Sequence, residues 1–283
     1  MTLLGDGTRT LVMGVVNVTP DSFSDGGAWF EPDAAVTHGR RLLADGADLL
    51  DVGGESTRPG AQRPSTDEEL ARVLPVVAEL ARSGAVVSVD TMRAEVAAAA
   101  IDAGAALVND VSGGLADPDM LALVAARGVP YIAMHWRGHS ADMQRRAAYD
   151  DVVAEVCCEL AQRRDAALAA GIEAERLVLD PGLGFAKLFE HNWVLLANLA
   201  ALQGLGQRVL VGASRKAFLG RVGRPDGVEP RPALERDAAT AATSVLAAQA
   251  GVWGVRVHDV RSTRDALDVL EAQQAAGRRA AGS

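Results

Sequence analysis

The stretch VVSVDTMRAEVAAAAIDAGAALVND, residues 86–110, decides the fold because it contains one complete strand–helix–strand unit. Its two apolar runs, VVSVDT and ALVND, have the length of strands, and each carries a carboxylate at or next to its end. A run that is apolar almost throughout is typical of a strand buried on both faces of a sheet. The helix-length segment between the runs is long enough for the crossover that parallel strands require.

The same unit recurs along the chain. Helix-length segments separate eight apolar runs, which are LVMGVVN, DLLDVGGES, VVSVDT, ALVNDVS, YIAMHW, LVLDPG, VLVGASRK and GVRVHDV. Right-handed crossovers make successive strands parallel, and eight such units favour a closed (β/α)8 TIM barrel over an open doubly wound sheet. No polar linker interrupts the alternation, so we predict a single α/β domain over residues 1–283, with long loops after strands one, two and seven and a disordered tail over 277–283.

Several helix boundaries can be predicted from local signals. Residues 65–69, STDEE, resemble a capping box at the start of a helix. Residues 117–118, DP, predict the start of a helix that stops at Gly128, and residues 31–32, EP, open another that ends near Gly46.

Charge and composition exclude some classes of function. The formal net charge of −9 argues against a nucleic-acid-binding or membrane-surface protein, because both need a basic face. The first ten residues lack a basic segment followed by an apolar one, so we expect a soluble, cytoplasmic protein. Cys157 and Cys158 are neighbours on a predicted helix, where adjacent side chains diverge, so we expect both to be reduced.

Polar residues recur where the predicted strands end, and in a closed barrel they form one shared rim. The residues of this rim are Asn17, Asp51, Glu55, Asp90, Asn109, Asp110, His135, Asp180, Ser214, Arg215, Lys216, Arg256 and His258. A charge at such a depth is costly unless a partner satisfies it. Either the rim is a salt-bridge network that only supports the structure, or a ligand supplies the partners of these charges. The first interpretation suits Asp110 best.

The residue types of the rim suit a nitrogen heterocycle. The carboxylates of Asp90 and Asp180 can accept two hydrogen bonds from an amidine-like edge, and the amide of Asn109 can serve a donor and an acceptor together. Lys216 can donate to a ring carbonyl or nitrogen, and it is one of only two lysines in the chain, a skew that codon bias would also explain.

A zinc site is not indicated, because the histidines lack the paired spacing of a zinc motif. Asn17 and the acidic residues of the first loop would instead suit magnesium bridged to a phosphate. The loop GASRKAFLG, residues 212–220, places basic residues at a helix start, where backbone N–H groups favour an anion. The loops after strands one and two are either lids on the catalytic face or mobile surface connections.

Eight motifs occur in order along almost the whole chain. They are MGVVNVTPDSFSDGG, DVGGESTRPGA, SVDT, NDVSGG, MHWRG, LDPGLGFAK, GASRKAFLG and GVRVHDV. Through these motifs the chain resembles the bacterial dihydropteroate synthases, a family of pterin-binding barrel enzymes. The resemblance implies the joining of 6-hydroxymethyl-7,8-dihydropterin diphosphate to p-aminobenzoate, with release of diphosphate and 7,8-dihydropteroate. It also implies magnesium as cofactor, a homodimer packed through late helices, and competitive inhibition by sulfonamides.

The resemblance also implies roles for individual residues. The pterin site would comprise Asp90, Asn109, Met134, Asp180, Phe185, Gly212, Lys216 and Arg256. Among these, Asp90, Asp180, Lys216 and Arg256 would act in catalysis. The diphosphate would be held by Asn17, Arg58, Arg256 and His258, and magnesium by Asn17 and Asp25. The p-aminobenzoate site would comprise Phe23, Thr57, Arg58, Pro59, Ser214 and Ala217.

One position departs from the family pattern. Ala217 stands where the family often has a serine or arginine, so a side-chain contact to the aminobenzoate carboxylate is in doubt, although the backbone N–H remains available. Two other functions stay open: a pterin-binding methyltransferase, and a catalytically silent paralogue that binds a pterin or a partner protein. The intact first, second and seventh loops argue against both.

Overall fold

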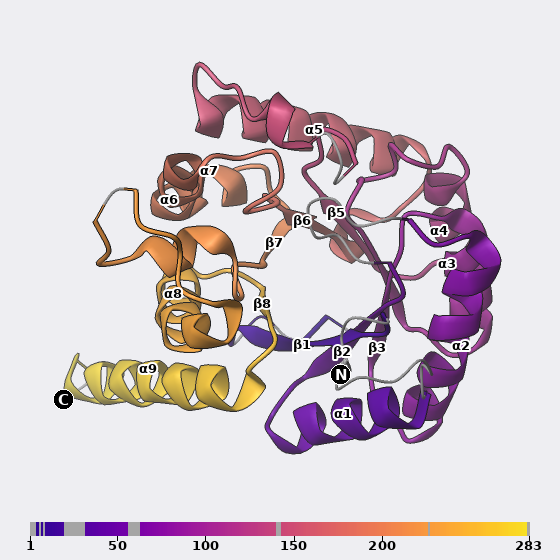
Figure 1. Ribbon diagram of the computed structural model, residues 1–283, viewed down its shortest axis with the longest axis horizontal. Coiled ribbons are helices and arrows are strands. Elements are labelled where there is room, and N and C mark those ends of the chain that lie inside the picture. Colours follow the sequence, from indigo (N-terminus) through magenta and orange to yellow (C-terminus); the bar gives the residue numbers. More distant parts are fainter. Residues whose placement is uncertain are drawn as a thin grey trace.

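A computed structural model describes residues 4, 5, 7, 9–19, 32–55, 63–139, 143–225 and 227–281. Eight parallel strands pair in sequence order and close into a barrel, because the last strand pairs with the first (Figure 1). The strands are β1 (Leu11–Asn17), β2 (Leu49–Gly53), β3 (Val87–Asp90), β4 (Leu107–Asp110), β5 (Tyr131–Met134), β6 (Leu177–Asp180), β7 (Arg208–Val211) and β8 (Gly254–Val257). The predicted single-domain (β/α)8 barrel is confirmed.

Helices surround the barrel and cover the outer face of the strands (Figure 1). They are α1 (Pro32–Ala44), α2 (Thr66–Arg82), α3 (Ala94–Asp102), α4 (Met120–Arg127), α5 (Val152–Ala169), α6 (Phe189–Ala197), α7 (Leu199–Gln203), α8 (Asp237–Gln249) and α9 (Val260–Ala281). None of the helices formed by these described residues is long and apolar enough to cross a membrane.

The helix boundaries follow the local signals closely. Ser65 caps α2 with the predicted capping box, in which its side chain accepts from the Glu68 N–H and the Glu68 carboxylate accepts from the Ser65 N–H. α4 ends at Gly128, whose φ of 62° is in the left-handed region that glycine adopts without strain. The predicted tail over 277–283 is wrong in part: α9 continues to Ala281 because its alanines, glutamines and arginines are strong helix formers.

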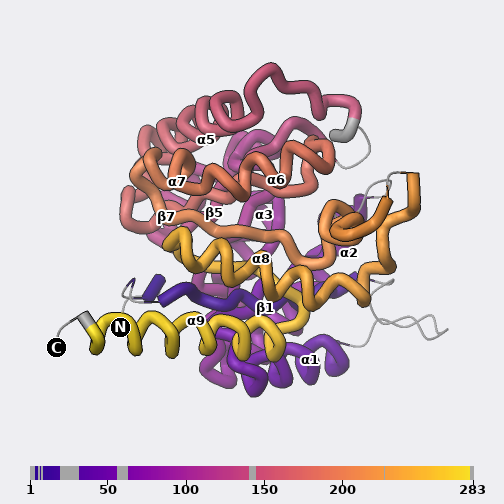
Figure 2. Tube along the Cα trace, turned by 90° about the vertical axis from the view of Figure 1, so that its left-hand side faces the viewer, coloured from indigo at the N-terminus to yellow at the C-terminus, as the bar shows by residue number. Residues whose placement is uncertain are grey.

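The connection after β7 is long, as predicted, but it does not begin with an α-helix. Two 3₁₀ turns, Ala217–Arg221 and Ala233–Arg236, precede α8. Glycines and prolines are frequent between residues 220 and 232, and they prevent a continuous helix. Figure 2 shows this orange loop at one end of the barrel and the end of α9 at the other.

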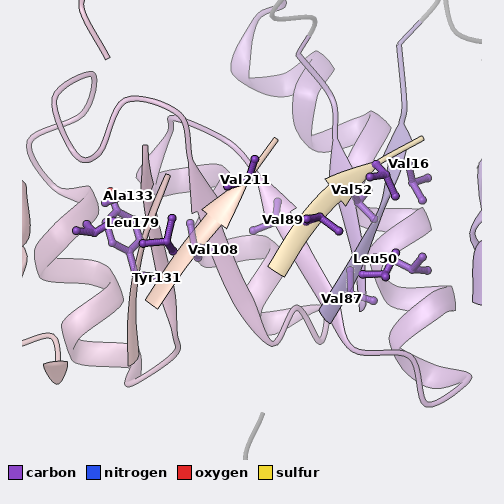
Figure 3. Close-up of a cluster of buried hydrophobic side chains, with 14 of the residues drawn as sticks. Val16, Leu50, Val52, Val87, Val89, Val108, Tyr131, Ala133, Leu179 and Val211 are labelled. Atoms are coloured by element: carbon purple, nitrogen blue, oxygen red, sulfur yellow. The ribbon is translucent and has the colours of Figure 1, made fainter. Parts of the chain in front are cut away.

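Alternate residues of each strand face the barrel interior and the surrounding helices. In β2, Leu50 and Val52 belong to the large core between strands and helices, part of which Figure 3 shows. Leu49 faces the interior and belongs to a separate buried cluster. This inner cluster comprises Leu4, Met13, Leu49, Leu107, Ile132, Val178, Leu210 and Trp253. It fills the amino-terminal half of the barrel, so any ligand site inside the barrel must lie at the carboxyl end of the strands.

Candidate functional site

The alternation along the strands selects which polar side chains face the barrel mouth. In a strand, the residue two positions after a member of the inner cluster also faces the barrel interior. It lies closer to the carboxyl end of the strand. These inward residues include Asp51, Asn109, Met134, Asp180 and Gly212. The pairing of neighbouring strands places Asp90 on β3 opposite Gly53 on β2, and Asn109 on β4 opposite Asp90.

Arg256 on β8 connects the polar residues on one side of the mouth. Its Nε donates to Asp51 Oδ2 at 2.6 Å and its Nη2 donates to Asp90 Oδ2 at 2.8 Å. The Asn109 amide donates to the same Asp51 Oδ2 at 2.9 Å. Asp51 is fully buried and thereby fixes the positions of both Arg256 and Asn109.

The sequence predicts Asp51 only as a member of the rim and assigns it no role in the site. The signal that could have revealed its importance is a carboxylate in the middle of a buried strand, between Leu50 and Val52. Its Oδ1 is buried and has no hydrogen-bond partner among the residues that the structure describes. Such an atom is able to accept a further hydrogen bond.

Asp180 lies across the mouth from this network. Its Oδ1 accepts from the Gly182 N–H at 2.7 Å. Its Oδ2 lies beside Gly212, where an added Cβ would be 3.6 Å from Oδ2 and 3.9 Å from the Cβ of Arg256. Gly212 therefore leaves open the space between Asp180 and Arg256 that a larger side chain would fill.

Lys216 reaches the mouth from the loop after β7. Its ammonium donates to the carbonyl of Leu183 and lies 4.6 Å from the centre of the Phe185 ring. Gly184, with a φ of 79°, makes this approach possible, because a Cβ there would come within 2.9 Å of the Lys216 Cδ.

Burial shifts the pKa values of the charged groups at the mouth. Burial, with the neighbouring Asp51 carboxylate, raises the pKa of Asp90, and Arg256 offsets part of that rise. Burial also raises the pKa of Asp180, against the attraction of Lys216. Burial lowers the pKa of Lys216 to about 8, although Asp180 favours its charged form. The mouth therefore holds titratable groups whose charge a ligand can shift, which is typical of a functional site.

One wall of the mouth is apolar. Met92, Val111 and Met134 form a buried cluster, and Phe185 packs against it. Two of these, Met134 and Phe185, are among the predicted wall residues. These side chains give the site an apolar lining beside its hydrogen-bonding groups, which suits a heterocyclic ligand.

The predicted anion-binding residues are held at the ends of β1, β7 and β8. Ser214 Oγ lies 2.9 Å from His258 Nδ1 and accepts from the His258 N–H at 3.1 Å. Asn17 is the last residue of β1 and is partly buried, and Ala217 is exposed at the start of its 3₁₀ turn. Arg215 does not join them, because its guanidinium donates to Asp237 at 2.7 and 2.8 Å.

Two rim residues, Asp110 and His135, face away from the mouth. Asp110 points outward with Val108, and its oxygens accept from Ser112 and Gly114 and from the Tyr131 hydroxyl. It supports structure, as the sequence favoured. His135, one residue beyond β5, contacts Glu159 and Lys187. Glu55 lies beside Met92, Val111 and Phe185 and pairs with Arg63 and Arg93.

The remaining predicted residues lie outside the described part of the chain. They are Phe23, Asp25, Thr57, Arg58 and Pro59. Over the described ranges, no group of three or more His, Cys, Asp or Glu side chains could hold a metal ion. Of the two predicted magnesium ligands only Asn17 is described, and its amide oxygen is of the type that magnesium accepts.

A cavity of about 450 Å³ lies at the opposite end of the barrel from the mouth, beside Trp253 and α9. Its charged groups are committed to protein partners: Arg9 pairs with Asp48, Glu271 with Arg264, and Arg208 donates to a backbone carbonyl. The convergent polar groups are at the mouth, which we therefore take as the candidate active site.

Comparison with known proteins identifies the family of the chain. The family described as "Pterin binding enzyme" matches residues 13–258. The dihydropteroate synthase of Mycobacterium leprae is 55% identical over 267 residues, which cover 94% of each chain. The structure of Xanthomonas albilineans dihydropteroate synthase in complex with 7,8-dihydropteroate has a TM-score of 0.84 at 46% identity and covers 97% of this chain and 96% of that one. The Yersinia pestis dihydropteroate synthase with a sulfonamide drug complex has a TM-score of 0.88 at 42% identity and covers 96% of each chain.

Proposed function

Because this chain belongs to the family of pterin-binding enzymes, we propose that the carboxyl-terminal mouth of its barrel is the active site of a dihydropteroate synthase. The chain joins 6-hydroxymethyl-7,8-dihydropterin diphosphate to p-aminobenzoate and releases 7,8-dihydropteroate and diphosphate. The observation that carries the assignment of the site is the convergence of Asp180, Asn109 and Lys216 beside the apolar wall at Phe185.

The pterin ring is recognised along its polar edge. Asp180 Oδ1 already accepts from the Gly182 N–H, so Oδ2 is the oxygen that mainly accepts from the N–H donors of the ring. The Asn109 amide group donates to Asp51, which leaves its carbonyl oxygen to accept from the same edge. Lys216 donates to a ring carbonyl or nitrogen, and Met134, Phe185 and Gly212 enclose the ring faces.

The reaction develops positive charge on the pterin and negative charge on the leaving group. The carbon–oxygen bond to diphosphate breaks as the dihydropterin ring spreads the developing cation, and the carboxylates of Asp90 and Asp180 stabilise it electrostatically. The aniline nitrogen then forms the new carbon–nitrogen bond and loses its proton to solvent or to a diphosphate oxygen. No strong protein base is required, and the mouth accordingly needs no Ser-His-Asp or Cys-His arrangement.

The diphosphate lies next to Arg256, Asn17 and His258, with Arg58 from the second loop. Asp51 and Asp90 hold the Arg256 guanidinium in place, so it stabilises the departing charge without reorganisation. Asn17 and Asp25 would hold magnesium through oxygen ligands, and the bound ion would neutralise charge on the diphosphate.

The p-aminobenzoate site is assembled from Phe23, Thr57, Arg58, Pro59, Ser214 and Ala217. The backbone N–H of Ala217, rather than its side chain, is the group available to the aminobenzoate carboxylate. Sulfonamides resemble this substrate and compete for the same site, a proposal supported by the sulfonamide complex of the Yersinia pestis enzyme.

We also propose that the protein is a homodimer and is located in the cytoplasm. Leu246 on α8 and Val269 on α9 are 59% and 71% exposed, and α8 and α9 pack side by side. Apolar side chains on adjacent exposed helices favour a homodimer through these helices. The free thiols of Cys157 and Cys158 suit the reducing cytoplasm.

A diphosphate-release assay tests the function directly. The protein is given dihydropterin diphosphate, p-aminobenzoate and magnesium, with Lys216→Met as the matched control. Stoichiometric diphosphate and dihydropteroate are expected from the wild type, and strongly reduced turnover from the variant. Pterin binding without turnover would support the silent paralogue, and methyl transfer from a methylated pterin would support the methyltransferase.

A further inference from the structure

Lys187 is the second of the two lysines in the chain and has no part in the reaction described above. It lies in the loop after β6, residues 181–188, and is only 4% exposed. Its Nζ lies 2.9 Å from His135 Nδ1 and 3.1 Å from the carbonyl oxygen of Phe185. Burying a lysine is costly, so this placement requires a reason beyond solubility or packing.

The two lysines hold the same loop at neighbouring points. Lys216 donates to the carbonyl of Leu183, and Lys187 donates to the carbonyl of Phe185. Between these two carbonyls is Gly184, whose N–H donates to Asn192 at 2.6 Å. The backbone on both sides of Phe185 is thus held by side chains, and the position of its ring depends on them.

Lys187 is connected through His135 to Glu159 on α5, outside the barrel. The Nε2 of His135 lies 2.9 Å from Glu159 on α5, so His135 donates through Nε2 and accepts from Lys187 through Nδ1. Arg137 donates to Glu159 as well. Burial and then Lys187 lower the pKa of His135 to about 4, which keeps its ring neutral and Nδ1 able to accept.

The shape of the amine also suits this place. Burial and the neighbouring Lys216 charge lower the pKa of Lys187 well below its usual value. The Lys187 nitrogen has enough N–H groups to donate to both acceptors, His135 Nδ1 and the Phe185 carbonyl. The planar fork of arginine does not fit two acceptors placed around a single nitrogen.

We propose that Lys187 is a positioning residue for the pterin site: by holding the Phe185 carbonyl, it places the Phe185 ring against the pterin and beside Lys216. The inference rests on the proposed pterin pocket and deepens it. Lys187 touches no substrate and acts only through Phe185.

A double-mutant cycle separates this role from one in stability. The Kd of a non-reactive pterin is measured by titration calorimetry for wild type, Lys187→Met, Phe185→Ala and the double variant. Lys187→Met should raise the Kd about fivefold or more, yet in the Phe185→Ala background it should raise the Kd less than about twofold, because the residue it positions is gone.

A control variant addresses stability alone. Thr10→Val removes a buried hydrogen bond to the Val252 carbonyl at the far end of the barrel, and it should lower Tm without changing the Kd. A structural role for Lys187 predicts the same pattern for Lys187→Met: a lower Tm and an unchanged Kd in the folded protein. That result, or equal effects of Lys187→Met in both backgrounds, would overturn the inference.

Folding failure is also informative. If Lys187→Met does not fold, the cycle is repeated with Lys187→Gln, which keeps an N–H donor. If neither variant folds, Lys187 is a residue of the fold and the inference is wrong. Failure of the wild type to bind the pterin at all would instead refute the proposed pocket.

Discussion

Asp180→Asn is the substitution whose effect follows most directly from the geometry. The two side chains have nearly the same shape, but asparagine has one acceptor oxygen instead of two. Asp180 Oδ1 accepts from the Gly182 N–H at 2.7 Å, and an amide NH₂ at that position would face another donor. The asparagine must therefore keep its oxygen toward Gly182 and turn its NH₂ group toward the ligand.

The size of the effect follows from the same contacts. Asp180 is 6% exposed, so water cannot replace the lost acceptor. Loss of a buried, charge-assisted hydrogen bond and its replacement by opposed donors should cost about 2–4 kcal/mol, which is about 30- to 900-fold in pterin Kd.

Asp110→Asn is the matched control. Asp110 is just as buried, but its oxygens are used by Ser112, Gly114 and Tyr131 on the outer side of the strand. Its substitution should lower Tm and leave the Kd of a non-reactive pterin, measured by titration calorimetry, within about threefold. Equal pterin affinity in wild type and Asp180→Asn would refute the assignment of Asp180.

Three further predictions concern the loops and the charge of the site. Lys216→Arg should lower turnover at least about tenfold, because the larger planar group must pass Gly184 and Phe185; normal steady-state kinetics would exclude a role for the compact ammonium. The pKa of Lys216 is lowered to about 8, so its ammonium is present below that pH and is lost above it. The kcat/KM for the pterin substrate should therefore fall as pH rises through about 8. A flat pH profile of kcat/KM up to about pH 10 would contradict this. Asp25→Ala should leave the Kd of a non-reactive pterin nearly unchanged while lowering turnover and weakening p-aminobenzoate capture, and the reverse pattern would place Asp25 in the pterin pocket.

The barrel could be predicted from the sequence because its strands are short, apolar and separated by segments long enough to form helices. The amino-acid pattern alone also identifies the polar residues at the strand ends, since closure of the barrel brings those ends together. The alternation within each strand also separates the residues that face inward from those that face outward. Counting from Leu107 and Ile132, which face inward, places Asp110 and His135 on the outer side.

Other features depend on three-dimensional contacts that no local pattern encodes. The pairing of Asp51 with Arg256 joins residues 205 positions apart, and only closure between β8 and β1 makes it possible. The bond from Lys187 to His135 likewise joins two loops that are separate in the sequence. The sequence predicts a helix start in the loop after β7 but not the type of helix, and the glycines and prolines that follow limit it to 3₁₀ turns.

A crystal structure of the protein with a non-reactive pterin tests the central claim most directly. The account predicts that the ring lies at the carboxyl end of the barrel, with its N–H donors on Asp180 Oδ2 and Asn109, Lys216 on a ring acceptor, and Phe185 against one face. A pterin bound in the cavity beside Trp253 at the other end, or at the mouth without contact to Asp180, would contradict it.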